Sequence, residues 1–378
     1  MYLNKVKGSP ALQLVNLVIE KTSKGERIIS LAIGEPTFET PDEIVEEAYK
    51  AMKKGETKYT SSFGIYEVRE TIAEKVRKKN RINAGTKNVL FTPAKYAVFA
   101  SIMAIVNKRG QILTPDPGYF YIEPITLAGA KPVYYRLNDD FSLNIDEIKS
   151  KITDKTLGII INTPANPTGK VYDEKELKEL YEVCKDKKIY IISDEAYEDL
   201  VYDKKHFSIG SLEEKPDKVI SIFSLSKSYS MTGWRAGYTV ANENIISNIN
   251  KLVENTMTCF PGFIQRASAY ALKYGDKYIE KFREEFRKRR DFTFKRLKEM
   301  KNIEIKNIEG AFYAFPKYFA RIKSVEISKR LLNEYNLALM PGISFGPSGE
   351  HHLRISFAGS METLSEGFDR MEEFFSKF

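Results

Sequence analysis

Residues that build disulfide or metal frameworks are scarce in this sequence. It contains two cysteines, Cys184 and Cys259, and three histidines in 378 residues. Disulfide-built domains are far richer in cysteine, so that class is excluded. The two cysteines share no CxxC or metal-ligand spacing, and three histidines are few for a metal centre. We therefore expect buried, apolar cysteines and no metal site.

Long apolar runs are also missing. No stretch approaches the roughly 18 uninterrupted apolar residues that a membrane span requires, and residues 1–5 lead into no signal-peptide pattern. With 42% hydrophobic and 29% charged residues, the chain has enough apolar side chains for a core and enough charge for solubility. The expectation is a soluble cytoplasmic protein of two domains, because its length exceeds twice the usual domain size of about 150 residues.

The charge balance is only modestly basic. There are 59 Lys and Arg residues against 51 Asp and Glu residues, a formal charge of +8, and the two signs are interleaved, as over residues 280–291. At helical spacing such charges lie on solvated faces. No nucleic-acid motif accompanies them, so a basic nucleic-acid-binding protein is a distant alternative. Abundant Lys and Glu with three Gln residues resemble the composition of a thermophile.

Short apolar runs alternate with amphipathic helical stretches in the central part of the chain. Seven of these runs predict strands, at residues 89–91, 111–114, 132–136, 158–162, 189–193, 219–223 and 237–240. Helical patterns such as 96–106 and 174–184 separate them, which indicates an α/β fold with a mostly parallel sheet between helices. A long charged helix at 277–300 follows, then strand-like pieces at 311–315 and 352–357, which predict a smaller α+β domain.

The predicted domain organisation follows from this change of pattern. Residues 45–280 form the large domain, residues 281–378 form the small domain, and residues 1–44 are an N-terminal segment that joins the small domain. Ligands of open α/β sheets bind beyond the carboxyl ends of the strands. Polar residues that directly follow the apolar runs are therefore the site candidates.

The strongest candidate segment follows the strand predicted at 219–223. Ser224, Ser226 and Lys227 come directly after it, and Arg235 lies eight residues beyond the lysine. A lysine amine in a partly desolvated pocket attacks aldehydes, while hydroxyl groups and an arginine can bind a phosphate. A solvated lysine in a polar loop is the alternative for Ser-Lys-Ser taken alone.

A second segment closes the strand predicted at 189–193 with Asp194, and Tyr197 follows three residues later. An unpaired buried charge is costly, so Asp194 needs a cationic partner. A protonated pyridine nitrogen would serve, as in enzymes that use pyridoxal phosphate, and Tyr197 could bond to the phenolate oxygen of the same ring. The alternative is an Asp that caps a helix N-terminus.

Three further segments carry weaker signals. Asn166 lies in a rigid turn between two prolines and a glycine. Tyr119 follows Asp-Pro-Gly and offers a ring for stacking on a flat ligand. Ala94 and Lys95 follow Pro93, and with Pro93 in the first helical position their amides would form a phosphate-binding helix start.

Arg354 is the candidate outside the sheet. It lies in the alternating run Leu-Arg-Ile-Ser-Phe at 353–357. An inward arginine there needs an anionic partner, and a substrate carboxylate fits a bidentate guanidinium. An internal salt bridge is the alternative.

Together and in this chain order, the motifs resemble the class I/II pyridoxal-phosphate aminotransferases of the aspartate aminotransferase fold (fold type I). The most specific part is Ser-Leu-Ser-Lys followed by Thr-Gly-Trp-Arg, with Asn-Pro-Thr-Gly and Asp-Glu-Ala-Tyr upstream. The resemblance extends over about residues 31–357. Gly34 matches the family's substrate-loop glycine, and Tyr59 lies in the segment whose tyrosine reaches the phosphate in the partner subunit. The large domain would then bind pyridoxal 5′-phosphate.

The resemblance implies a role for each candidate at the cofactor ring. Lys227 would form the internal aldimine and then carry the proton between substrate and cofactor, while Asp194 would keep the pyridine nitrogen protonated. Asn166 and Tyr197 would hold the phenolate oxygen, and Tyr119 would stack on the ring.

The phosphate and the substrate have their own implied ligands. Phosphate ligands would be Ser224, Ser226, Arg235, the amides of Ala94 and Lys95, and Tyr59 of the partner subunit. The substrate α-carboxylate would be bound by Arg354, Asn166 and the backbone of Gly34. Because Tyr59 must come from a partner, a homodimer with shared active sites is implied. The family usually has a glycine where this chain has Pro93, so we expect one phosphate contact fewer there, since proline has no N–H.

The expected substrates are amino acids and 2-oxo acids. Lys95 aligns with a lysine that meets the distal carboxylate of the substrate in one branch of aspartate aminotransferases. The expected reaction is therefore ping-pong conversion of L-aspartate and 2-oxoglutarate into oxaloacetate and L-glutamate. An aromatic or broad-specificity aminotransferase is the close alternative, and a pyridoxal-phosphate lyase or decarboxylase is a more distant one.

Overall fold

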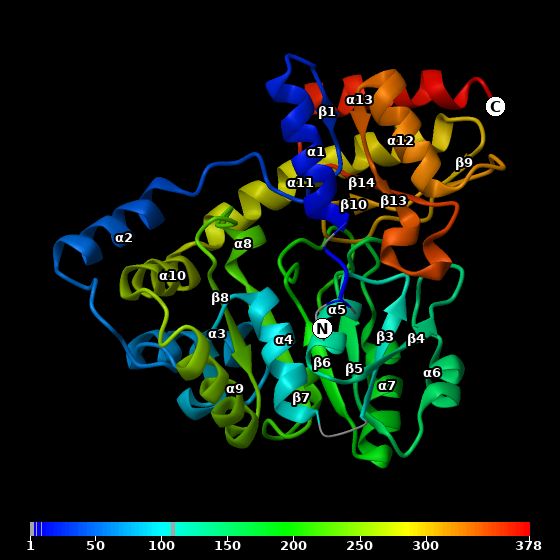
Figure 1. Cartoon of the computed structure of the whole chain (residues 1–378). Helices are drawn as coiled ribbons and strands as arrows, with labels where there is room; N and C mark the ends of the chain where they lie inside the picture. The colour runs from blue at the N-terminus through cyan, green and yellow to red at the C-terminus, as the bar shows by residue number, and fades with distance from the viewer. Residues whose placement is uncertain (1–3, 5, 9, 107–109) are drawn as a thin grey trace.

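A seven-stranded sheet forms the centre of the molecule (Figure 1). The computed structural model describes residues 4, 6–8, 10–106 and 110–378. The strand order is β2-β8-β7-β6-β5-β3-β4. The strands are β2 (Val89–Phe91), β3 (Gln111–Asp116), β4 (Lys131–Arg136), β5 (Thr156–Asn162), β6 (Tyr190–Asp194), β7 (Val219–Ser224) and β8 (Gly237–Val240). β8 runs antiparallel to both of its neighbours, and the other pairs are parallel. The predicted α/β class with a mostly parallel sheet is confirmed.

Helices cover both faces of the sheet, which explains why its strands are continuous apolar runs. Along β5, Ile160 joins the core on one face, while Ile159 and Ile161 join the core on the other. The helices of this part are α3 (Tyr66–Lys79), α4 (Ala94–Ile105), α5 (Ile122–Leu127), α6 (Ile145–Lys151), α7 (Glu174–Lys187), α8 (Leu225–Ser228), α9 (Glu243–Thr256) and α10 (Gly262–Tyr274). None of the helices in the described ranges is long and apolar enough to cross a membrane.

Apart from α2, the remaining α-helices and strands form a second layer beyond the carboxyl ends of the parallel strands (Figure 1). They are α1 (Pro10–Ser23), β1 (Ile29–Ser30), α11 (Asp276–Glu299), β9 (Ile303–Glu304), β10 (Tyr313–Ala314), β11 (Lys317–Tyr318), α12 (Ser324–Tyr335), β12 (Leu337–Ala338), β13 (Met340–Pro341), β14 (Leu353–Ser356) and α13 (Met361–Phe375). β1 pairs in parallel with β12, so the N-terminal segment lies beside the C-terminal part. α11 is one continuous helix through residue 280, and the domain boundaries remain a prediction.

Hydrogen bonds between Asp116 and Ser348 join the central sheet to the second layer. The carboxylate of Asp116, at the end of β3, accepts hydrogen bonds from the backbone N–H and the hydroxyl of Ser348, at 2.9 and 2.8 Å. α2 (Asp42–Lys53) packs against α10 and projects from the side of the molecule (Figure 1). The sheet edge that carries the site candidates therefore lies under the second layer.

Candidate active site

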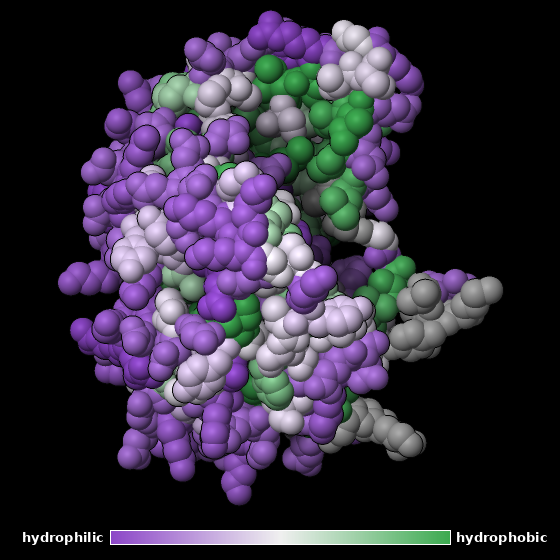
Figure 2. All heavy atoms as spheres, turned by 90° about the vertical axis from the view of Figure 1, so that its left-hand side faces the viewer, coloured by the Kyte–Doolittle hydropathy of each residue, from purple (hydrophilic) through white to green (hydrophobic). Residues whose placement is uncertain are grey.

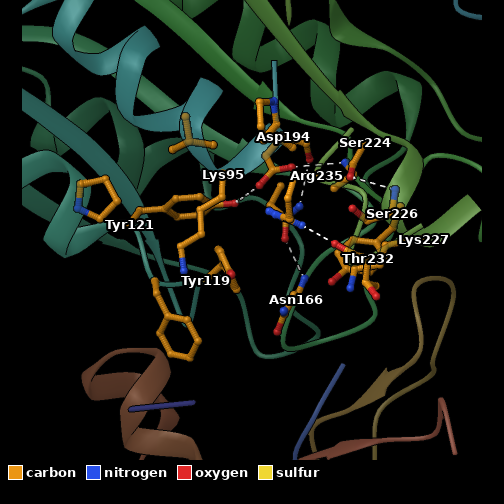
Figure 3. Close-up of a pocket in the computed structure, with 18 of the residues that line it drawn as sticks. Lys95, Tyr119, Tyr121, Asn166, Asp194, Ser224, Ser226, Lys227, Thr232 and Arg235 are labelled. Carbon is orange, nitrogen blue, oxygen red and sulfur yellow. Dashed lines mark hydrogen bonds between the residues drawn. The ribbon is translucent and has the colours of Figure 1, made fainter. Parts of the chain in front are cut away.

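A cavity of about 230 Å³ lies at the carboxyl ends of the central strands (Figure 3). Ten residues selected from the sequence line it, namely Ala94, Lys95, Tyr119, Asn166, Asp194, Tyr197, Ser224, Ser226, Lys227 and Arg235. They come from separate strand ends that a parallel sheet brings to one edge. The chemistry of this set depends on which charges are buried there without partners.

Lys227 lies in the short helix α8, which begins as soon as β7 ends. Ser224 caps this helix, because its hydroxyl oxygen accepts a hydrogen bond from the Ser226 N–H at 3.2 Å. The Lys227 Nζ donates to the Gly34 carbonyl oxygen at 2.6 Å. Burial lowers the pKa of the Lys227 amine to about 8, since a desolvated ammonium is disfavoured. The amine is half-buried and hydrogen bonded rather than fully solvated, and its lowered pKa suits attack on an aldehyde.

Asp194 is buried at the end of β6. Its Oδ2 accepts a hydrogen bond from the Tyr121 hydroxyl at 2.8 Å, and its Oδ1 accepts one from the Ala196 N–H at 3.2 Å. Burial raises the pKa of Asp194 to about 6, although both hydrogen bonds oppose this shift. Within the described residues, no lysine or arginine forms an ion pair with it. A buried carboxylate that lacks a cation fits a protonated ring nitrogen.

Arg354, on β14, is 3% exposed and carries an unused donor. Its Nη1 donates to Asn166 Oδ1 at 3.2 Å and its Nη2 donates to the Ala32 carbonyl oxygen, but its buried Nε has no partner. Burial also lowers the pKa of this guanidinium. In the part of the chain that the structure describes, no carboxylate pairs with Arg354, so the internal salt bridge is not formed. The free Nε and the uncompensated charge fit a substrate carboxylate.

Tyr197 and Gly34 share a neighbour that the sequence analysis did not select. The hydroxyl groups of Tyr197 and Tyr313 are 2.9 Å apart and hydrogen bonded. A Cβ atom on Gly34 would lie 1.8 Å from the Tyr313 hydroxyl, so a side chain at position 34 has no room. Tyr313 also lies under Arg354, with its ring centre 4.6 Å from the guanidinium carbon. The only sequence signal for Tyr313 was its place in the strand-like run 311–315.

The start of α4 differs slightly from the expectation. Ala94 is the first helical residue and Pro93 is the N-cap. The expectation had placed Pro93 in the first helical position instead. Ala94 and Lys95 are then the first two helical residues, whose N–H groups have no acceptor within the helix. Because the proline ring lies outside the helix, these two amides remain available to a phosphate. The missing contact at Pro93 stays a prediction.

Arg235 and Lys95 bring two more positive charges to the cavity. The Arg235 Nη1 donates to the Thr232 carbonyl oxygen at 2.6 Å, which leaves further guanidinium donors for an anion. The Lys95 Nζ lies 5.9 Å from the centre of the Tyr119 ring. Figure 3 shows both side chains in the group around the cavity. An anionic ligand with a flat ring suits this combination of cations and an aromatic face.

Tyr59 and the cysteines lie outside the cavity. Tyr59 is 87% exposed and contributes nothing to the cavity of its own chain. Cys184 is buried, and burial raises the pKa of its thiol to about 12, which makes it unreactive. Cys259 is half-buried, and its Sγ accepts a hydrogen bond from the Thr60 N–H at 3.4 Å. Cys184 is buried as predicted, whereas Cys259 is only partly so.

Known proteins share this arrangement along nearly the whole chain. The family described as aminotransferase class I and II matches residues 26–371. An aspartate aminotransferase of Pyrococcus abyssi is 40% identical, over 92% of this chain and 91% of that protein. An aromatic-amino-acid aminotransferase 2 of Thermococcus litoralis is 38% identical, over 92% of each protein. The solved structure of the aspartate aminotransferase from Thermus thermophilus with maleate is 29% identical, covers 98% of each chain and has a TM-score of 0.93.

The family match agrees with the buried charges of the cavity. An amine of lowered pKa, a carboxylate without a cation and a guanidinium without an anion are the groups that a pyridine aldehyde phosphate and an amino acid would complete. The chain therefore belongs to the class I and II aminotransferases, a family of enzymes that depend on pyridoxal 5′-phosphate.

Proposed function

We propose that the protein transfers the amino group of L-aspartate to 2-oxoglutarate, giving oxaloacetate and L-glutamate. The observation that carries this proposal is the pair of cations near the cavity. Arg354 has an unpartnered buried donor beside Asn166, and Lys95 lines the cavity directly. Two cations suit a substrate with two carboxylates. The relative named aspartate aminotransferase and the Thermus structure with maleate, itself a dicarboxylate, support the same choice.

The side chains of the cavity would divide the work as follows. The cofactor supplies an aldehyde and an electron-accepting ring. Lys227 Nζ would hold the aldehyde carbon and move a proton at the substrate α-carbon, for which its lowered pKa suits it. Asp194 would hold the proton of the ring nitrogen, and Tyr197 and Asn166 would donate to the phenolate oxygen. Arg354 would orient the α-carboxylate, which fixes the bond that loses its proton.

A substitution at Lys95 tests the choice of a dicarboxylate. Lys95→Ala keeps the backbone amide of the α4 start and removes only the side-chain charge. We expect kcat/KM for aspartate to fall by about 10- to 100-fold, since a charge-assisted hydrogen bond contributes about 1.5–3 kcal/mol. The value for tyrosine or alanine should change little. Lys175→Ala, on the exposed face of α7, is the control, and equal losses on charged and uncharged substrates would contradict the assignment.

Aromatic amino acids are the second candidate substrates. Phe120 lines the cavity beside Tyr119 and stacks on Phe345 with ring centres 5.1 Å apart. These apolar faces could accept a ring, and the Thermococcus litoralis relative is named for aromatic amino acids. The kcat/KM values of the wild-type enzyme for tyrosine and for aspartate decide between the two.

We also propose a homodimer with shared active sites. Tyr59 is exposed, so most of its side chain is open to contact with another subunit. The projecting helix α2 exposes Val45, Tyr49 and Met52, spaced by four and three residues on one face. Helix α1 also exposes Leu12, and Figure 2 shows a further apolar area on a mostly hydrophilic face. In the proposed dimer, a second copy covers α2 and Tyr59 lies near the other subunit's cavity.

Mixing two defective variants tests the shared site. Lys227→Ala removes the amine of its own site, and Tyr59→Ala removes the phosphate ligand offered to the other site. In a mixed dimer, one site keeps both groups. We expect activity at limiting cofactor to reappear after the two proteins are unfolded and refolded together, but not after each is refolded alone. No recovery, with dimers seen by light scattering, would show that each subunit has a complete site.

A cytoplasmic location is a further proposal. Both cysteines are unpaired, which suits a reducing compartment. Cell fractionation followed by immunoblotting tests it, and recovery with a membrane or secreted fraction would contradict it.

A further inference from the structure

Tyr121 has no role in the reaction as described so far, yet it touches the residue that faces the cofactor ring. It is 1% exposed and immediately precedes α5. Its hydroxyl donates to Asp194 Oδ2 at 2.8 Å, in a fully buried contact between two strand-end segments. Its ring packs edge-on against Tyr119 with ring centres 5.6 Å apart. The hydroxyl is therefore held in place by packing on one side and by the carboxylate on the other.

The hydrogen bond from Tyr121 affects the pKa of Asp194, because this carboxylate is buried and has few donors. The carboxylate has two donors, Tyr121 and the Ala196 N–H, and the Tyr121 contact is the shorter one. A hydrogen bond to the ionised form lowers the pKa of a carboxyl, whereas burial raises it. Tyr121 is the strongest influence that lowers the pKa of Asp194. Without it, the Ala196 N–H alone would oppose the effect of burial, and the carboxyl would bind its proton more tightly.

Tyr121 can keep this role over a wide pH range. Burial and the negative charge of Asp194 raise the pKa of the Tyr121 phenol well above its ordinary value. The hydroxyl therefore stays protonated, and remains a donor, to a higher pH than an ordinary phenol would. A histidine in the same place would change its charge near neutrality.

We propose that Tyr121 is a positioning residue that keeps the Asp194 carboxylate ionised and fixed in one orientation toward the ring nitrogen of the cofactor. The proposal rests on pyridoxal phosphate binding in this cavity, and it is independent of which amino acid is the substrate. It assigns Tyr121 to cofactor recognition, since only an ionised Asp194 discriminates for a protonated ring nitrogen.

The test compares the dissociation constants of two cofactors for two tyrosine variants, and it also follows the titration of Asp194. The probes are pyridoxal phosphate and its 1-deaza analogue, in which a C–H group replaces the ring nitrogen. The variants are Tyr121→Phe and, as a matched control, Tyr135→Phe. Tyr135 is equally buried, and its hydroxyl also donates a 2.8 Å hydrogen bond, but to the Ile160 carbonyl oxygen. The control therefore loses a comparable contact elsewhere in the sheet.

For Tyr121→Phe we expect the dissociation constant of pyridoxal phosphate at pH 7 to rise about ten-fold, the size of one charge-assisted hydrogen bond. Binding of the deaza analogue should stay unchanged, and Tyr135→Phe should leave the ratio of the two constants as in the wild type. In the apo-protein, the titration midpoint of Asp194, followed by carbon-13 NMR, should rise by about one unit. An equal loss of affinity for both cofactors, or an unchanged midpoint, would show that Tyr121 only fills space and would overturn the proposal.

Discussion

Replacing Lys227 with alanine should lower kcat for transamination by at least about four orders of magnitude, because in the proposed function one amine supplies both the covalent anchor and the proton carrier. The Lys227 side chain is half-buried, its Nζ contacts the Gly34 carbonyl oxygen, and burial lowers its pKa to about 8. No other lysine that lines the cavity has this combination, since Lys95 lies at the start of α4 beside Tyr119. Steady-state assays with aspartate and 2-oxoglutarate measure the loss.

Lys227→Arg is the informative companion variant. Arginine keeps a positive charge in the same place but stays protonated at neutral pH, so it neither attacks an aldehyde nor accepts a proton. Both variants should still bind the cofactor weakly through the other groups of the cavity. A rate within about ten-fold of the wild type for either variant would show that another group does the chemistry.

Replacing Asp194 with asparagine should have two opposite effects. The first is a loss of activity of about three orders of magnitude, because the amide carries no charge to hold the proton on the ring nitrogen. The second is a gain in stability of the apo-protein at pH 8. The pKa of Asp194 is about 6 in the folded protein and about 3.9 in an unfolded chain. Above pH 6 the ionised, buried carboxylate therefore lowers the free energy of unfolding, by about 2–3 kcal/mol at most.

The pH dependence of this gain separates it from ordinary repacking. As pH falls from 6 to 4, the carboxyl of the wild-type folded protein becomes neutral, and the advantage of asparagine should shrink steadily. Urea unfolding of both apo-proteins at several pH values measures it. Asp154→Asn, at an exposed position between α6 and β5, is the control and should show no such trend. An asparagine variant less stable than the wild type at pH 8 would contradict the account.

Most of the residues that line the cavity could be predicted from the sequence, because the geometry of a parallel sheet brings the strand ends together. Asp194, Asn166 and Lys227 each follow an apolar run, and the carboxyl ends of parallel strands meet at one edge, so three separate motifs had to converge. Helix α4 begins at Ala94, between the helical pattern expected from residue 96 and the first helical position considered for Pro93, because a proline suits both the N-cap and the first helical position. Such offsets are typical of helix ends.

Tyr121 and Tyr313 show what the sequence could not supply. The chain has 22 tyrosines, and many of them are core residues, so residue type alone selects none. Their roles arise from packing, as the Tyr121 hydroxyl reaches Asp194 across the sheet edge and the Tyr313 hydroxyl fills the space beside Gly34. The domain boundary expected at residue 280 also depends on packing. A charged helical pattern predicts α11, but it does not show which layer each half of the helix contacts.

The two buried charges at and near the cavity, Asp194 and Arg354, have a consequence for the stability of the protein in a cell. Within the described residues, Asp194 and Arg354 are hydrogen bonded but have no oppositely charged partner until a ligand arrives, so the newly made chain is less stable than the loaded one. When synthesis outpaces the supply of the cofactor, more of the chain is exposed to proteases, and its abundance falls. The amount of enzyme should therefore follow the supply of cofactor as well as gene expression.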